Sequence, residues 1–239
     1  MIYQDPTLIR LLSIIIPMPF IGIVFLFLAF KILKRSRSQL SLTLSVFYIL
    51  IGIAVFINLT FLLITPTRID ILLFILYFLT SYLILFAFIF IVVFIHNLLK
   101  IDSIYSFKKY SIIILVYGIS CFMLLIAVPE GIRISSETNW VPLYSWTFLL
   151  VEYVFFTCFI TISTLIYAIK LYNKFKDKNL KKKLRYFILG IFGMILILYL
   201  IVLNNTWQDI TFKTVLSISS FFIMVPSALS IYYGIGQNL

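Results

Sequence analysis

Glu152 lies well inside a long apolar segment, whereas the other acidic residues of the chain lie between such segments or at their ends. It follows Trp146 by six residues, which places its carboxyl group roughly 9 Å along a helix from Trp146. An ionisable group at this depth of a membrane-spanning helix is energetically costly. It therefore indicates a functional site whose other members must be sought on neighbouring helices.

Polar side chains in other apolar segments fall close to the depth of Glu152. Asn58 precedes the end of its segment by six residues, and Tyr77 follows the start of its own segment by six. The residues within about two helical turns of this depth are Tyr199, Thr60, Thr80, Ser81, Tyr153 and Ser217. We expect a ligand-binding site formed by Glu152, Asn58, Tyr77, Tyr199 and Ser217.

Three roles are open for Glu152. No Lys or Arg is expected in this layer, so burial favours the protonated, neutral carboxyl group. In that form it can join two helices through a hydrogen bond to Asn58 or to a tyrosine, worth about 1 kcal/mol. It can also anchor a ligand or carry a proton in a coupled transporter. The absence of a second carboxylate along the path argues against a proton relay.

Residues required by common membrane enzymes and cofactors are missing. The single histidine, His96, cannot supply both axial ligands of a b-type haem. Lys213 stands at the entrance of the last segment, whereas a retinal Schiff base needs a lysine at its middle. No His-Glu-x-x-His or Gly-x-Ser-x-Gly motif is present. We therefore expect no enzymatic activity, no catalytic residues, no metal ligands and no cofactor.

The apolar segments are numerous and long enough to define the class of protein. Hydrophobic residues make up 63% of the chain and charged residues 11%, compared with about 25% charged residues in soluble domains. A helix that crosses a membrane needs about 20 apolar residues. The sequence predicts an all-α integral membrane protein, a seven-transmembrane-helix bundle that forms a single domain over residues 1–239, with spans of about 7–30, 40–64, 71–97, 110–128, 143–171, 186–203 and 214–235.

Positive charge alternates between successive connections. If the segments cross the membrane in turn, 15 of the 19 Lys and Arg residues lie on one side. Short connections rich in Lys and Arg stay cytoplasmic, so we expect the N-terminus outside and the C-terminus inside a cell membrane that the chain crosses several times. Trp140, Trp146 and Trp207 then fall at outer span ends, where indole rings favour the headgroup region.

The connection from Tyr172 to Arg185 is expected to be the longest cytoplasmic loop. Its basic residues include Lys181, Lys182, Lys183 and Arg185. We expect these four side chains to contact anionic lipid of the cytoplasmic leaflet rather than nucleic acid.

Prolines inside the spans predict bends. Pro17 and Pro19 fall in the first span and Pro226 in the last, and proline removes a helix hydrogen bond. We expect kinks at these positions. A kinked last helix that leads to the cytoplasmic end is a candidate moving part, although a purely structural role is the alternative.

Two stretches carry a likeness to a known family. Residues 181–190 read Lys-Lys-Lys-Leu-Arg-Tyr-Phe-Ile-Leu-Gly, and residues 225–235 read Val-Pro-Ser-Ala-Leu-Ser-Ile-Tyr-Tyr-Gly-Ile. With the outside N-terminus and short loops, they resemble the N-terminal seven-helix sensor region of membrane histidine kinases. In that family the seventh helix continues into cytoplasmic signalling and kinase domains. Because this sequence ends at Leu239, any signalling output that the resemblance implies would need a cytoplasmic partner or a longer parent polypeptide.

The expected function is therefore that of a receptor-like sensor that binds a small or lipophilic ligand in its outer half. A large cavity at Glu152, closed toward the cytoplasm, would favour it. A transporter or channel is one alternative and would require a continuous polar path from Glu152 to His96. A non-catalytic scaffold subunit is another, and a filled core would favour it.

Overall fold

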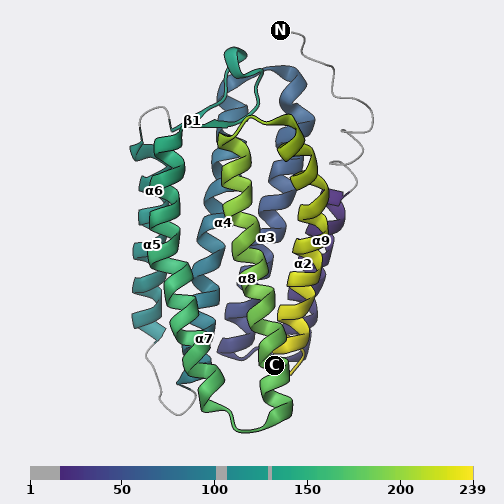
Figure 1. Ribbon diagram of the computed structural model, residues 1–239, viewed down its shortest axis with the longest axis vertical. Coiled ribbons are helices and arrows are strands. Elements are labelled where there is room, and N and C mark those ends of the chain that lie inside the picture. Colours follow the sequence, from purple (N-terminus) through teal and green to yellow (C-terminus); the bar gives the residue numbers. More distant parts are fainter. Residues whose placement is uncertain (1–16, 101–106, 129–130, 239) are drawn as a thin grey trace.

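The computed structural model describes residues 17–100, 107–128 and 131–238, and long helices dominate it (Figure 1). The elements are α2 (Pro17–Arg35), α3 (Gln39–Ile64), η1 (Thr65–Thr67), α4 (Asp70–Leu99), α5 (Phe107–Ala127), β1 (Ile132–Arg133), η2 (Ser136–Thr138), β2 (Leu143–Tyr144), α6 (Trp146–Phe156), a π-helical segment η3 (Thr157–Thr161), α7 (Ile162–Lys174), α8 (Lys178–Thr206), α9 (Ile210–Gly234) and η4 (Gly236–Asn238). Because α6, η3 and α7 are continuous, the described residues contain seven helices long and apolar enough to cross a membrane. The chain is a multi-pass integral membrane protein.

Side-chain caps fix where the later helices begin. The carboxylate of Asp177 accepts a hydrogen bond of 2.8 Å from the Asn179 amide at the start of α8. Asp209 does the same for the Phe212 amide, at 2.6 Å, at the start of α9. The first turn of a helix leaves its amides without helical partners, so these carboxylates satisfy them and suit the positive end of the helix dipole.

The helices extend beyond several of the expected spans. The long loop predicted from Tyr172 to Arg185 is wrong, because α7 ends at Lys174 and α8 begins at Lys178. Lysine and arginine are good helix formers, so the basic stretch continues the helix past the apolar segment. The predicted start of the fifth span also differs, because residues 143 and 144 form β2. The predicted start of the first span, at residue 7, lies outside the described residues.

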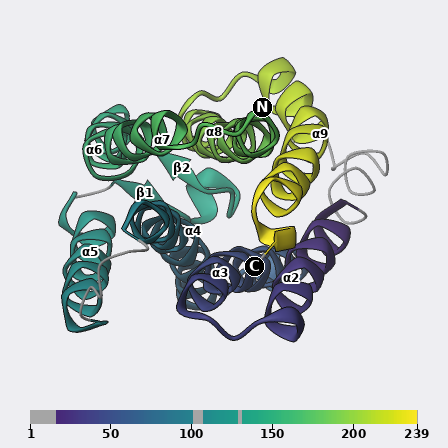
Figure 2. The same cartoon turned by 90° about the horizontal axis from the view of Figure 1, so that it is seen from below.

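Most of the helices follow one another around a ring, as Figure 2 shows. Going around the ring, α2 packs on α3, α3 on α4, α4 on α7, α6 and α7 on α8, α8 on α9, and α9 on α2. Helix α5 lies outside this ring against α4. The interior of the ring is thus bounded by helices from both ends of the chain.

Helices α8 and α9 approach each other closely at small residues. A Cβ atom added at Gly190 would lie 2.5 Å from the main-chain oxygen of Ser227, and one at Gly193 would meet the Ser227 side chain. A Cβ atom at Gly234 would lie 2.6 Å from the Phe187 nitrogen. Small residues allow such backbone contact between membrane helices. Residues 181–190 and 225–235, which carry the family resemblance, therefore belong to one interface.

The two ends of the bundle differ in structure and charge. One, the hairpin end, holds η1, the two-stranded sheet of β1 and β2, and the connection between α8 and α9. The other, the basic end, holds the connections between α2 and α3 and between α7 and α8. Trp146 and Trp207 are exposed at the hairpin end, whereas Trp140 lies against the Arg68 guanidinium and donates a hydrogen bond to Asp70.

Candidate ligand-binding site

A cavity of about 320 Å³ occupies the half of the bundle next to the hairpin end. Its walls come from α2, α3, α4, α6, α8 and α9, and residues 141, 142 and 144 close it on the hairpin side. Four of the five residues predicted from the sequence line it, namely Glu152, Asn58, Tyr77 and Ser217. Thr80 and Ser81, from the same predicted layer, line it as well.

Glu152 projects from α6 and is buried, with 4% of its surface exposed. Its Oε2 atom has no hydrogen-bond partner among the described residues. Buried polar atoms in folded proteins almost always have a partner, and an unpaired one calls for an explanation such as a ligand or water. The hydrogen bond to Asn58 or a tyrosine that a purely structural role would use is therefore not made by this oxygen.

A hydrogen-bonded chain crosses the hairpin side of the cavity. Asn205 Nδ2 donates to the Tyr77 hydroxyl at 2.7 Å, and the Tyr77 hydroxyl donates to that of Tyr144 at 2.9 Å. The Tyr144 hydroxyl lies 3.4 Å from Ser81 Oγ. Burial raises the pKa of Tyr144, so its hydroxyl group keeps its proton. The chain joins α8, α4 and the β2 strand around the cavity.

Tyr199 does not line the cavity but links α8 to the π-helical segment. Its hydroxyl lies 2.9 Å from Thr161 Oγ1 and also bonds Thr157, while its carbonyl accepts a hydrogen bond of 2.6 Å from Tyr153. The predicted polar layer is thus divided between the cavity and this second cluster. The fifth predicted site residue, Tyr199, belongs to the second cluster. Thr60 is exposed and bonds its own helix.

A layer of aromatic rings underlies the cavity. The rings of Phe25, Phe47, Tyr48, Phe88 and Phe156 form a continuous series with centroid separations between 5.1 and 5.7 Å. We call this layer the aromatic floor. Phe25, Phe88 and Phe156 each follow a cavity-lining residue, Ile21, Leu85 and Glu152, by three or four positions along the helix. The floor therefore lies one helical turn beyond the cavity, toward the basic end.

The proline positions differ in what the structure describes around them. Pro226 lies inside α9, two residues after Met224, which lines the cavity. It cannot donate the helical hydrogen bond to the carbonyl four residues earlier. Pro17 and Pro19 lie in the first turn of α2 as described, where amides have no helical partner. The residues before them lie outside the described part of the chain, so the kink there stays a prediction.

Several residues of the cavity were not expected from the sequence. They are Tyr144, Asn204, Asn205 and Lys213, which line its hairpin side. Asn204 Oδ1 is buried and has no hydrogen-bond partner among the residues described. Lys213 adds a basic side chain to the hairpin side of the cavity. Its ammonium group donates to the Gln208 side chain.

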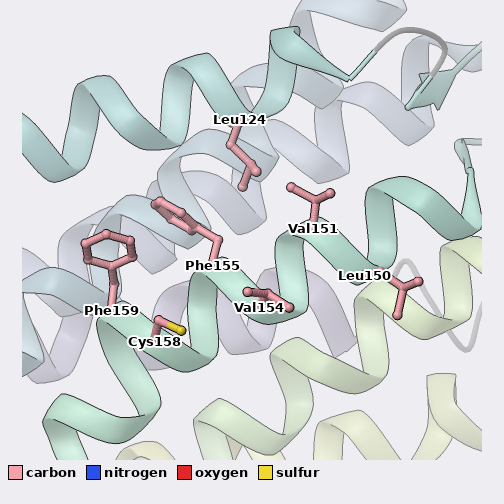
Figure 3. A pocket seen from close by; sticks show the side chains of 7 residues that line it. All are labelled: Leu124, Leu150, Val151, Val154, Phe155, Cys158 and Phe159. Atoms are coloured by element: carbon pink, nitrogen blue, oxygen red, sulfur yellow. The ribbon is translucent and has the colours of Figure 1, made fainter.

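A second hollow is a groove on the outer surface of the bundle (Figure 3). Its volume is about 470 Å³, and it runs between α5 and the α6–η3 helix. Its residues are apolar apart from the Cys158 thiol, namely Leu124, Leu150, Val151, Val154, Phe155 and Phe159. Leu150 and Val154 are more than half exposed. On a membrane protein such a surface offers hydrocarbon contact alone, so the cavity at Glu152 is the better candidate site.

His96 lies near the basic end of α4, on the far side of the aromatic floor. Its Nδ1 atom is 2.9 Å from the Tyr110 hydroxyl, and its ring contacts that of Tyr167. Of the predicted lipid-contact residues, Lys182, Lys183 and Arg185 are exposed at this end. Arg185 also donates to the Tyr172 hydroxyl, and the Lys181 ammonium lies over the Tyr172 ring.

Comparison with models of known protein families, with curated proteins and with solved structures found no match to the chain. Within the residues that the structure describes, no group of three or more His, Cys, Asp or Glu side chains could hold a metal ion. The cavity is lined by hydrogen-bonding groups, and Glu152 and Lys213 are its acidic and basic side chains.

Proposed function

We propose that this protein is a receptor-like membrane sensor module that binds a small ligand in the cavity at Glu152 and signals through helix movement. One observation carries the proposal. A carboxyl group that is 4% exposed, with one oxygen unpaired, lines a cavity of about 320 Å³. Ligand pockets typically have volumes of about 300 to 1,000 Å³, apolar walls and a few polar groups that orient the ligand.

The aromatic floor supports binding rather than transport. A transporter or channel needs a polar path from Glu152 toward His96, and the rings of Phe47, Phe88 and Phe156 stand between them. All three side chains are buried, with at most 1% of their surface exposed. A scaffold subunit, in turn, gives no reason for an unpaired carboxyl oxygen in a cavity.

Helix α9 is the element best suited to carry a signal. Ser217 and Phe221 of α9 line the cavity. At Pro226 the helix lacks one main-chain hydrogen bond, and beyond it the helix continues to the basic end. A ligand that binds one arrangement of α9 more tightly than another shifts the population of the two arrangements. We propose that a cytoplasmic partner senses this shift at the basic end.

The orientation belongs to the same proposal. The basic end carries the Lys and Arg excess, so we propose that it faces the cytoplasm, where Lys181, Lys182, Lys183 and Arg185 contact anionic lipid. The hairpin end and the cavity then face outward. The bilayer concerned is a cell membrane.

Thermal unfolding of the purified protein tests ligand binding. Wild type and Glu152→Gln are compared across a panel of small amines, alcohols, carboxylic acids, sugars and short-chain lipids, with Glu137→Gln as the control. Glu137 is exposed in η2 and does not line the cavity. We expect a panel member to raise the unfolding midpoint of wild type and the control but not that of Glu152→Gln. If no compound distinguishes Glu152→Gln from the control, the proposal fails.

Signalling needs a separate readout at the basic end. An environment-sensitive fluorophore on Lys182→Cys, in a Cys121→Ala and Cys158→Ala background, reports changes near the start of α8. We expect the stabilising compound to change its emission, and the change to disappear when Glu152→Gln is added. Binding without any change at this position or at Ile235→Cys would support a binding protein that does not signal.

A further inference from the structure

The hydrogen-bond donors of the cavity wall are largely occupied. The hydroxyls of Thr80, Ser217 and Ser220 donate to carbonyl oxygens of their own helices, at 2.9, 2.7 and 3.0 Å. The Asn205 amide and the Tyr77 hydroxyl are used within the chain that crosses the hairpin side. These groups therefore have little to offer a ligand as donors.

In the described part of the chain, the buried side-chain atoms of the cavity that lack a partner are both oxygen atoms. Among the described residues that line the cavity, the buried side-chain atoms without a partner are Glu152 Oε2 and Asn204 Oδ1. They come from α6 and α8, on two walls of the same cavity. A ligand that satisfies both must bring at least two donors. A single hydroxyl group supplies only one proton, and a carboxylate supplies none.

The acidic and basic side chains of the cavity also favour a ligand that carries hydrogen-bond donors. Glu152 is the acidic side chain and Lys213 the basic side chain among the lining residues. The ammonium of Lys213, in the first turns of α9, donates to the side chain of Gln208, five residues earlier in the sequence. The Oε2 atom of Glu152, in contrast, has no hydrogen-bond partner among the described residues. An ionised carboxylate buried this deeply requires a cationic, hydrogen-bonding partner, and a ligand can supply it.

We propose that the ligand is a primary amine with a compact apolar body, held by Glu152 and Asn204. This inference rests on the proposed function. The ammonium group has three donors, enough for Glu152 Oε2 and Asn204 Oδ1 together. The apolar body then contacts Ile21, Phe61, Leu198 and Met224, which also line the cavity.

Three probes with one apolar body and different head groups test the inference. They are 2-phenylethylamine hydrochloride, 2-phenylethanol and sodium phenylacetate, titrated at equal ionic strength into protein in lipid nanodiscs and followed by calorimetry and thermal unfolding. We expect the amine to bind most tightly to wild type. Glu152→Gln should weaken it by about tenfold or more, as expected when a charged hydrogen bond is lost. Asn204→Ala should weaken it less, and Glu137→Gln should leave it unchanged.

The outcomes separate the two proposals. If the alcohol or the carboxylate binds more tightly than the amine, and Glu152→Gln or Asn204→Ala weakens that binding, the amine inference is overturned while the cavity remains a ligand site. Amine binding that is equal in wild type and in both cavity variants also overturns the inference. If none of the three probes and no member of the wider panel binds, both proposals fail.

Discussion

The Tyr48 hydroxyl donates a hydrogen bond of 2.8 Å to the main-chain carbonyl of Ala228, which joins the aromatic floor to α9 just beyond Pro226. Both residues are fully buried. The Tyr48 ring also contacts Phe25 of α2 and Phe47 of its own helix. One side chain thus connects three helices of the ring at the level where the cavity ends. A movement of α9 at Pro226 must stretch or break this bond.

Removing that hydroxyl should weaken the fold slightly and loosen α9. Tyr48→Phe keeps the ring and its packing, so we expect a loss of about 1 kcal/mol of stability, typical of one hydrogen bond. Thermal unfolding of the purified protein measures the loss. Tyr186→Phe is the matched control, because Tyr186 is 47% exposed. Equal midpoints for the two variants would contradict a stabilising role for the bond.

The chain of hydroxyls beside the cavity predicts an order of effects. Tyr77→Phe removes both the acceptor for Asn205 and the donor to Tyr144, whereas Tyr144→Phe removes a bond of 2.9 Å and a longer one of 3.4 Å. We expect Tyr77→Phe to lower stability by about 1 to 3 kcal/mol, because it leaves the partly buried Asn205 amide unpaired, and Tyr144→Phe to cost less. Unfolding midpoints in the same detergent give the order, and the reverse order would show that the chain is not organised around Tyr77.

The fold class and part of the site follow from the sequence for simple physical reasons. A helix has a fixed rise per residue, so counting from span ends brought Asn58 and Tyr77 to the level of Glu152 and Ser217 within about two turns of it, and all four line the cavity. The depth of a residue does not determine on which face of its helix the side chain lies. Tyr199 lies near the same level, but its hydroxyl contacts Thr157 and Thr161 instead of the cavity. Both threonines belong to the π-helical segment between α6 and α7, which the sequence analysis did not predict.

The residues that were missed lie where the ends of helices were misjudged. Asn204 and Asn205 follow the predicted end of the sixth span at residue 203, so they were assigned to a loop, yet α8 continues to Thr206. Tyr144 was assigned to a span but belongs to β2, which folds over the cavity. Hydropathy marks the apolar part of a helix, whereas capping residues such as Asp177 and Asp209 mark its true ends.

The close contact between α8 and α9 makes Gly190 sensitive to substitution. In Gly190→Ala the new Cβ meets the main chain of Ser227, which cannot move without separating the helices. We expect a loss of about 1 to 3 kcal/mol, as for other overpacked interiors. In the control, Gly118→Ala, the new Cβ meets the far end of the Phe86 ring, which can rotate away. That variant should be neutral or gain up to about 1 kcal/mol from helix propensity. Chemical or thermal unfolding measures the stability of both variants. Equal losses of stability would contradict the close packing of α8 and α9.

The orientation of the bundle can be tested with single cysteines. In a Cys121→Ala and Cys158→Ala background, Glu137→Cys adds a thiol at the hairpin end and Lys176→Cys adds one at the basic end, and both positions are exposed. Because connections rich in Lys and Arg remain cytoplasmic, a membrane-impermeant maleimide should label residue 137 but not residue 176 in intact cells. Permeabilised cells should label both, which controls for the reactivity of each thiol. The opposite pattern would place the cavity on the cytoplasmic side, so that a ligand at Glu152 would come from inside the cell.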